Sequence, residues 1–239
     1  MRVVILCGGK GERLREHTEV IPKPLIEIGG KPILWHIMKI YSYHGYNDFI
    51  LCLGYKGEKI KDYFNQNNSE NWNIEFVDTG LDTNTGGRIK KIEKYIKTKD
   101  FMATYADAVS DINIKEVVDQ HKKQGKIATM TCVKLRSNFG IVDIDNDDAV
   151  VGFKEKPFVD MWINAGFFVF NKKIFNYLKE NSVLEGGPME QLAKDKQLAA
   201  YKYNGFWEGM DTYKDTRMLN EMYDKGNAQW IVWGKDGKA

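Results

Sequence analysis

The 239-residue sequence has little cysteine, almost no excess of charge and no long apolar run. Its three cysteines, Cys7, Cys52 and Cys132, are far apart in apolar stretches, so neither a disulfide framework nor a zinc site is indicated. Lysine plus arginine number 35 and aspartate plus glutamate 33, a balance that argues against a nucleic-acid surface or a polybasic membrane segment. The four histidines have no ligand spacing, so no metal role is predicted for them.

The N-terminus also lacks the apolar region and cleavage site of a secretory signal, and no apolar run approaches the roughly 18 residues of a membrane helix. We therefore expect a cytoplasmic protein. Hydrophobic residues make up 43% of the chain, which is enough to form a sizeable core. No repeat, low-complexity stretch or clear linker interrupts the sequence, so a single domain over residues 1–239 is expected.

Strand and helix patterns alternate through the first half of the chain, which predicts an α/β fold with a Rossmann-like, mostly parallel sheet flanked by helices. An Asn/Asp-rich turn at residues 145–148, between two apolar runs, predicts a small added antiparallel hairpin. The predicted strands cover residues 3–6, 49–53, 74–77, 101–105, 127–133, 140–144, 150–153, 167–170 and 199–203. The predicted helices cover residues 31–44, 56–64, 114–123, 172–179, 189–195 and 212–224.

A glycine-rich loop follows the first predicted strand. Gly8, Gly9 and Gly11 can adopt positive φ and carry no Cβ, so their backbone N–H groups can point at anionic oxygens. Arg13 adds a planar donor fork. A Walker loop is excluded because no Gly-Lys-Ser/Thr follows, and a dinucleotide fingerprint is excluded because Leu14 occupies the place of its third glycine. The glycines alone would equally suit a surface turn.

A lysine held between two prolines comes next. Pro22 and Pro24 fix φ on either side of Lys23 and favour an extended backbone before each proline. The ammonium group is thus presented from a stiff support. Together with the glycine loop, this arrangement indicates a nucleoside triphosphate site.

The whole chain resembles the sugar 1-phosphate nucleotidyltransferases, and its tryptophan-rich segments and W-H-I-M helix resemble the glucose 1-phosphate cytidylyltransferase branch. The resemblance rests on the loop at residues 6–14, I-P-K-P around Lys23, residues 29–41, T-G-G-R at 85–88, Y-A-D-A-V-S-D at 105–111, E-K-P at 155–157, W-I-N-A-G from Trp162 and G-F-W-E-G-M-D-T from Gly205.

This resemblance implies in-line attack of an acceptor phosphate oxygen on the α-phosphorus of CTP, with Mg²⁺ as cofactor and pyrophosphate as leaving group. It further implies a homo-oligomer that makes CDP-linked precursors of capsule or O-antigen. The implied catalytic residues are Lys23, Arg13 and Asp107, and the implied Mg²⁺ ligands are Asp107 and Asp211. The implied nucleotide-binding residues are Leu6, Gly8, Gly9, Gly11, Glu12, Arg13, Lys23, Thr83 and Arg88. The implied acceptor-binding residues are Glu155, Lys156, Trp162 and Asn164.

Taken without the resemblance, several of these residues have a plainer interpretation. Asp107 and Asp211 could be turn or helix-cap residues, and their separation of 104 positions carries no spacing signal. Glu155 and Lys156 could form a solvated turn after the hairpin, and Trp162 could be a core aromatic.

Three departures from the family pattern bear on the acceptor. Glu12 replaces a threonine, Ala106 and Ala108 replace glycines beside Asp107, and the stretch between Phe64 and Trp72 is shorter than in the glucose 1-phosphate enzymes. We expect the alanine methyl groups to crowd the acceptor side. The acceptor is therefore either glucose 1-phosphate or a non-sugar phosphate, such as a polyol phosphate or phosphoglutamine. A third hypothesis is a catalytically silent nucleotide-binding subunit.

Overall fold

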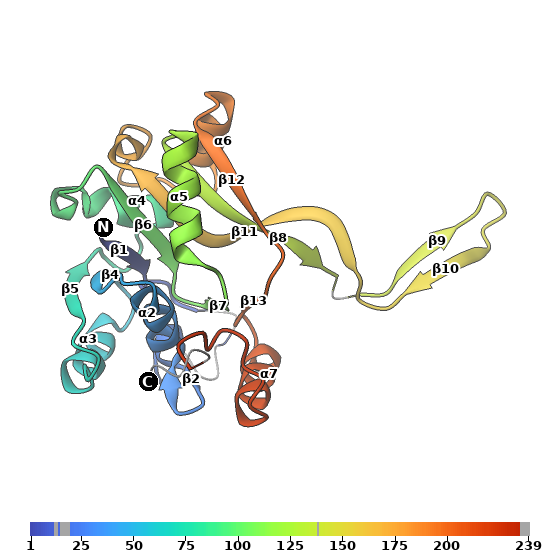
Figure 1. The fold of residues 1–239 in the computed structure, drawn as a ribbon, viewed down its shortest axis with the longest axis horizontal. Coiled ribbons are helices and arrows are strands. Elements are labelled where there is room, and N and C mark those ends of the chain that lie inside the picture. The colour runs from blue at the N-terminus through green and yellow to red at the C-terminus, as the bar shows by residue number, and fades with distance from the viewer. Residues whose placement is uncertain (12–13, 15–19, 138, 235–239) are drawn as a thin grey trace.

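The structure is a computed structural model that describes residues 1–11, 14, 20–137 and 139–234. A seven-stranded sheet in the order β12-β8-β11-β6-β1-β4-β5 forms its centre (Figure 1). Neighbouring strands are parallel except at β11, which is antiparallel to β6 and β8. The strands are β1 (Val3–Leu6), β4 (Asp48–Leu53), β5 (Asn73–Asp78), β6 (Asp100–Tyr105), β8 (Ala128–Arg136), β11 (Phe158–Asn171) and β12 (Leu198–Tyr203). The predicted fold class is confirmed.

Helices cover both faces of this sheet. Side chains of β1 alternate between two buried clusters, with Val3 and Ile5 in one and Val4 in the other, as expected for a strand buried on both sides. The first cluster includes residues of α2 (Ile33–Tyr43), α3 (Gly57–Gln66), α5 (Ile114–Gln124) and α7 (Tyr213–Asp224). The second includes residues of α4 (Thr85–Lys91), η4 (Lys172–Asn176) and α6 (Gly187–Lys194). The fold therefore has three layers, with the sheet between two layers of helices.

Three two-stranded sheets are added to this core. They are β2 (Glu27–Ile28) with β3 (Lys31–Pro32), β7 (Ala108–Ser110) with β13 (Trp207–Gly209), and β9 (Ile141–Ile144) with β10 (Val150–Lys154). The short helices η2 (Lys23–Leu25) and η3 (Glu93–Tyr95) complete the described elements. The β9–β10 hairpin projects from the body beyond the ends of β8 and β11 (Figure 1). We call residues 139–154 the arm.

The predicted strands are all present, and the hairpin at residues 140–153 is confirmed. The helix predicted at residues 31–44 begins later, at Ile33, because Pro32 is extended and pairs with Glu27. The segment predicted as a helix at 172–179 is the short 3₁₀ helix η4. The strand predicted at 167–170 extends back to Phe158. The expected single domain stays a prediction.

Helix α4 was not predicted because two of its seven residues are glycines. A Cβ at Gly87 would lie 2.1 Å from the Glu180 carbonyl oxygen, so glycine permits this close approach. No helix within the described ranges is both long enough and apolar enough to cross a membrane.

Candidate active site

A pocket of about 610 Å³ lies where the parallel strands β1 and β6 end. Leu6 and Tyr105, the last residues of these strands, pair in register, and both line the pocket. Ligands of open α/β sheets bind outside the carboxyl ends of the strands, so the position suits a substrate site. The remaining lining comes from the glycine loop, the segment 81–88, Lys23, Pro24, Ala106, Asp107 and Asp211.

Arg88 of α4 supports the glycine loop through hydrogen bonds. This buried guanidinium donates hydrogen bonds to Gly8 O at 3.0 Å, and also to the carbonyl oxygens of Leu53, Gly80 and Leu81. A Cβ at Gly8 would lie 2.0 Å from Arg88 Nη1, so this contact requires glycine. Burial lowers the pKa of Arg88 from its ordinary value. Arg88 thus supports the loop. Because these acceptors are neutral carbonyl oxygens, they do not cancel the positive charge of Arg88, which remains beside the pocket.

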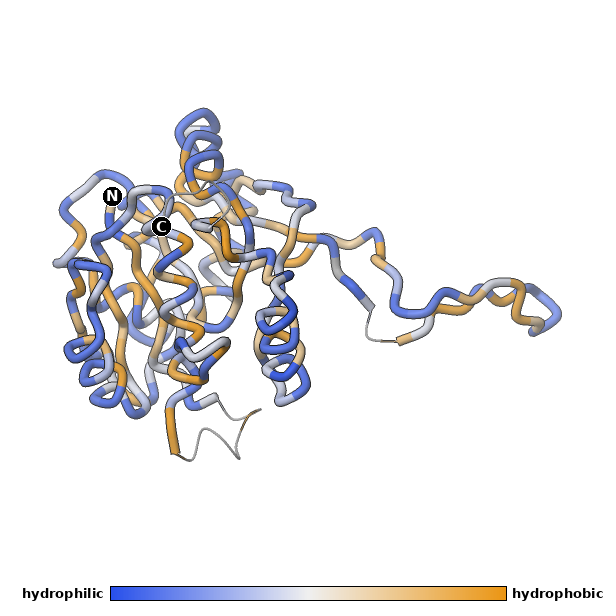
Figure 2. Tube along the Cα trace, turned by 60° about the horizontal axis from the view of Figure 1, so that its bottom comes forward, coloured by the Kyte–Doolittle hydropathy of each residue, from blue (hydrophilic) through white to orange (hydrophobic). Residues whose placement is uncertain are grey.

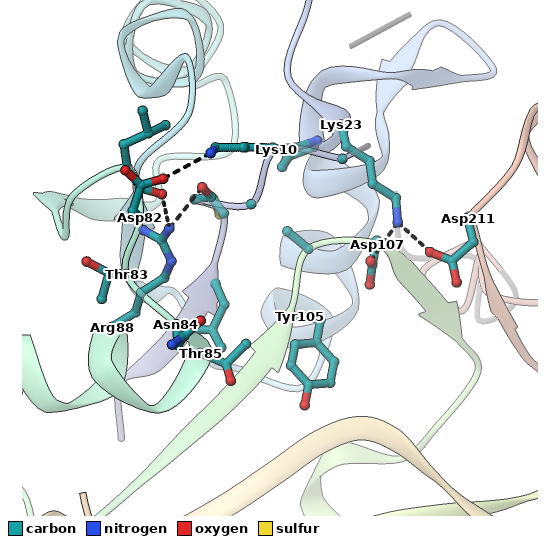
Figure 3. A pocket seen from close by; sticks show the side chains of 18 residues that line it. Lys10, Lys23, Asp82, Thr83, Asn84, Thr85, Arg88, Tyr105, Asp107 and Asp211 are labelled. Carbon is teal, nitrogen blue, oxygen red and sulfur yellow. Dashed lines mark hydrogen bonds and ion pairs between the residues drawn. The ribbon is translucent and has the colours of Figure 1, made fainter. Parts of the chain in front are cut away.

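The side chain of Lys23 extends toward two carboxylates that lie beside it (Figure 3). Its Nζ lies 2.7 Å from Asp107 Oδ2 and 2.8 Å from Asp211 Oδ1. The lysine side chain is only 12% exposed, and it begins η2 directly after Pro22. The structure therefore brings together three of the predicted catalytic and metal residues.

The two aspartates meet because β7 pairs with β13. Ala108 lies opposite Gly209 in this short antiparallel ladder, and the Met210 N–H donates to Asp107 O at 2.8 Å. Asp211 then directly precedes Thr212, the N-cap of α7, and its N–H is bonded to the Asp215 carboxylate of the capping box. Neither aspartate is the N-cap residue that the plainer interpretation allowed.

The donor set fits a divalent cation. Two carboxylates converge on one positive group, and oxygen ligands of this kind are those that Mg²⁺ prefers, with further positions left to water and phosphate. The described residues contain no cluster of three or more histidine, cysteine, aspartate or glutamate side chains arranged for a metal. Any ion between Asp107 and Asp211 would thus need ligands from the substrate or from water.

The pocket wall opposite Lys23 contains the predicted Thr83 and several residues that the sequence reasoning missed. Thr83 Oγ1 donates to Thr79 O at 2.6 Å, and Lys10 pairs with Asp82 at 2.9 Å between their charged atoms. Leu6, Gly8, Gly9 and Gly11 line the pocket as well. Glu12 and Arg13 lie outside the described residues.

Tyr105 connects the pocket to the predicted acceptor side. Its hydroxyl donates to Glu185 and lies 3.4 Å from the Asn164 amide nitrogen, which donates to it. Burial, followed by the nearby Glu185 carboxylate, raises the pKa of Tyr105. Thr85 Oγ1 donates to the same carboxylate at 2.7 Å. No sequence motif pointed to Glu185, which is brought here by the fold.

The other predicted acceptor residues do not line the pocket. Trp162, on β11, lies under two ammonium groups, 4.7 Å from Lys134 and 5.4 Å from Lys202 measured to the ring centroid. Glu155 and Lys156 lie at the base of the arm and are exposed. Of the four predicted residues, Asn164 is therefore joined to the pocket, by its hydrogen bond to Tyr105.

The two alanines beside Asp107 are accommodated without backbone strain. Neither Ala106 nor Ala108 has a positive φ, and both are buried. Ala106 lines the pocket, whereas Ala108 belongs to β7. The three cysteines are free and buried.

The fold and this site define a nucleotidyltransferase, and comparison with known proteins agrees. The chain belongs to the nucleotidyl transferase family, whose pattern it matches over residues 2–223. It is 46% identical to a probable glucose-1-phosphate cytidylyltransferase of Bacillus subtilis and 43% identical to the glucose-1-phosphate cytidylyltransferase of Salmonella typhimurium. Each alignment covers 98% of this chain and 100% of the relative.

Solved structures show the same fold. HddC from Yersinia pseudotuberculosis, complexed with GMP-PN, is 27% identical and superposes with a TM-score of 0.74 over 93% of this chain and 99% of that one. A putative glucose-1-phosphate thymidylyltransferase from Bacillus anthracis gives a TM-score of 0.76 at 19% identity, over 98% of both chains.

Proposed function

We propose that this enzyme transfers the cytidylyl group of CTP to a sugar 1-phosphate, with glucose 1-phosphate as the first candidate. The full-length relatives at 46% and 43% identity are named for this reaction. The structural observation that carries the proposal is the convergence of Lys23, Asp107 and Asp211 opposite a glycine loop backed by Arg88. Such a pocket places cationic and N–H groups on both sides of a polyphosphate.

The reaction needs no covalent enzyme intermediate. An oxygen of the acceptor phosphate attacks the α-phosphorus of CTP, the bond from that phosphorus to the bridging oxygen breaks, and pyrophosphate leaves with the electron pair. Both reactants are polyanions, so positioning and charge neutralisation are the main demands on the protein. Asp107 and Asp211 would hold Mg²⁺, which when bound supplies positive charge to the phosphates.

Several residues of the pocket have a part in this scheme. The N–H groups of Gly8, Gly9 and Gly11 hold the β- and γ-phosphates, together with Arg13 and Glu12 N–H of the same loop. Lys23 exchanges its carboxylate partners for the α-phosphate. Thr83 and Leu6 contact the nucleoside, and Arg88 acts by fixing the loop.

The acceptor occupies the side of the pocket near Asn164 and Tyr105. Trp162, Glu155 and Lys156, which were predicted for the same role, lie outside the pocket on β11 and at the arm base. The product would serve as a CDP-linked precursor of capsule or O-antigen, and we place the reaction in the cytoplasm. A polyol phosphate or phosphoglutamine is the alternative acceptor.

Pyrophosphate release measured with four nucleoside triphosphates against these three acceptors tests the proposal. We expect release with CTP and glucose 1-phosphate in the presence of Mg²⁺. Asp107→Asn serves as the inactive control, and Asp119→Asn, which changes an exposed carboxylate of α5, as the matched active control. Release with only a polyol phosphate or only phosphoglutamine would identify that compound as the acceptor instead of glucose 1-phosphate. Absence of release with every combination would contradict catalysis altogether.

A further inference from the structure

Two lysine side chains converge on one tryptophan beside the acceptor side of the pocket. The ammonium nitrogens of Lys134, on β8, and Lys202, on β12, lie 4.7 and 5.4 Å from the ring centroid of Trp162 on β11. Trp162 also pairs directly with Lys134 in the ladder of β8 and β11. None of the three side chains lines the catalytic pocket, so the phosphate contacts described above do not account for them. We call Lys134, Trp162 and Lys202 the lysine-tryptophan cluster.

The cluster lies on the same side of the sheet as Asn164. Asn164 pairs with Cys132, and Cys132 pairs with Lys202 on the next strand. Directly opposed residues, and residues two apart on a strand, point to one side of a sheet, so Trp162 and Lys202 share a side with Asn164. The step from Asn164 to Trp162 along β11 is about 7 Å, at roughly 3.3 Å for each of two residues. Since Asn164 is hydrogen-bonded to Tyr105 of the pocket, the cluster continues the acceptor side outward.

The cluster is open to solvent. Lys202 is exposed, Trp162 is half-buried, and the side chain of Lys134 is 29% exposed. The ends of β8 and β11 lead out of the helical layers toward the arm (Figure 1 and Figure 2). An extended acceptor that is bound at the pocket can therefore reach the cluster along the surface.

Positive charge is in excess at the cluster. In the part of the chain that the structure describes, Asp160 pairs with Lys134, and Lys202 makes no ion pair. Pairing with Lys134, helped by the charge of Lys202, lowers the pKa of Asp160, so one carboxylate responds to both ammonium groups. The Asp160 side chain is 93% exposed, and ion pairs of such exposed groups are weak. An anionic group of a ligand can therefore take the place of this carboxylate.

We propose that the lysine-tryptophan cluster binds a second anionic group of the acceptor, at the end remote from the phosphate that reacts. The inference rests on the proposed cytidylyl transfer and narrows its substrate class to phosphorylated acceptors that also carry a carboxylate or a second phosphate. The reacting phosphate lies beside Lys23 and Asp107 in the proposed scheme, so it is not the group that the cluster holds. Two ammonium groups suit an anion, and the indole offers an apolar face to the carbon skeleton next to it.

Acceptor preference tests this subsite. Pyrophosphate release from CTP is measured with glucose 1-phosphate, glucuronic acid 1-phosphate and glucose 1,6-bisphosphate, which differ only at carbon 6. We expect kcat/KM to be at least about tenfold higher for one or both acidic acceptors than for glucose 1-phosphate, because charge-assisted hydrogen bonds are the stronger kind. The carboxylate and the phosphate compounds distinguish the two kinds of second anion.

The double variant Lys134→Met with Lys202→Met removes both charges and keeps unbranched side chains over Trp162. The ratio of kcat/KM between acidic and neutral acceptors should fall to about one in this variant. Lys61→Met with Lys225→Met, at two exposed lysines elsewhere, lowers the net charge equally and should keep the ratio of the wild type.

Asp160→Asn tests the competition between carboxylates. This variant removes the anion that pairs with Lys134 in the structure, so the preference for acidic acceptors should increase. A merely structural role of Asp160 would not shift the preference in that direction. Titration calorimetry of the same three compounds, with the protein and a non-hydrolysable CTP analogue, repeats the comparison without turnover.

Equal use of all three acceptors by the wild type would overturn the subsite and leave cytidylyl transfer standing, as would a preference that the double lysine variant retains. Absence of release with all three would instead contradict the proposed transfer to a sugar 1-phosphate, and calorimetry would then decide on the subsite. Tighter binding of an acidic compound by the wild type, lost in the double lysine variant, would support it. Any other calorimetric result would overturn it.

Discussion

Asp107 and Asp211 share one ammonium group, that of Lys23, although 104 positions separate them in the chain. Two carboxylates that both approach one ammonium group are close enough in space to repel each other unless a cation lies between them. Lys23 supplies that cation in the structure, and it is itself largely buried. Cation binding and lysine position are therefore coupled, and the first two predictions follow from this coupling.

Replacing either carboxylate tests its part in the site. Asp107→Asn and Asp211→Asn keep side-chain volume but remove charge, so kcat should fall by about 10²-fold or more while the fold persists. Pyrophosphate release at saturating Mg²⁺ measures the first effect and circular dichroism the second. Turnover close to that of the wild type would remove the substituted residue from the catalytic site.

Removing the lysine should free the carboxylates. Lys23→Met leaves two negative groups without their shared ammonium, so binding of Mn²⁺ in the absence of nucleotide should become about tenfold tighter or more. Electron paramagnetic resonance of free Mn²⁺ measures this directly. The same variant should lose kcat more than nucleotide affinity, because charge on the α-phosphate develops in the transition state. Unchanged Mn²⁺ binding would contradict competition between lysine and metal.

Arg88 should matter for stability and substrate binding together. Arg88→Met leaves the carbonyl oxygens of Gly8, Leu53 and Gly80 without their donor, which should cost about 2–4 kcal/mol in the free energy of unfolding. The loosened loop should also raise KM for the nucleotide. Chemical denaturation and steady-state kinetics measure the two effects. Arg217→Met, at an exposed arginine of α7, is the control and should alter neither.

His36 should make stability depend on pH. Its Nε2 donates to Ile28 O at 2.8 Å and its Nδ1 accepts from Trp230, which requires a neutral ring. Burial lowers the pKa of His36 from 6.5 to about 4. The unfolded chain thus binds a proton more readily, so stability present above pH 6.5 is lost as pH falls toward 4, by about 3 kcal/mol. In His36→Gln this part of the loss should vanish, as urea denaturation at pH 7 and pH 5 will show. An equal loss in both proteins would contradict the buried neutral ring.

Base selection gives a fifth prediction. A site that accepts a hydrogen bond from the 4-amino group of cytosine leaves that acceptor unpaired against uracil, so CTP should exceed UTP in kcat/KM by about 10²-fold or more. Competition assays with both nucleotides provide the measurement. Equal use of UTP would place the enzyme in another branch of its family.

The sheet and most helices could be predicted because each has a local signature. Strand β1 is an unbroken apolar run, and the apolar positions of α2 recur at helical spacing. Helix α4 has no such signature, since Gly86 and Gly87 are there for close contact with residues 180–184 rather than for helix formation. Close approach between distant segments is a property of the folded chain and leaves no periodic trace.

The same distinction applies to the site. The glycine loop and Lys23 are adjacent in sequence and could be identified as a phosphate site from backbone chemistry. The meeting of Asp107 with Asp211 depends on the three-residue ladder of β7 and β13, which is too short to be recognised without the family resemblance. The resemblance also could not indicate that Glu155 and Lys156 lie at the base of a projecting arm, because that depends on how β8 and β11 leave the sheet.

The ladder of β7 and β13 also sets when the catalytic centre can exist. A ribosome that has made the first 200 residues has produced the glycine loop, Lys23, Asp107 and the whole seven-stranded sheet except the end of β12, yet not the segment that carries Asp211. A prematurely terminated chain of that length contains the phosphate-binding groups but lacks one of the two carboxylates, and it also lacks Leu219 and Trp230 of the first buried cluster. The catalytic centre is therefore complete only after the segment that carries Asp211 has been synthesised.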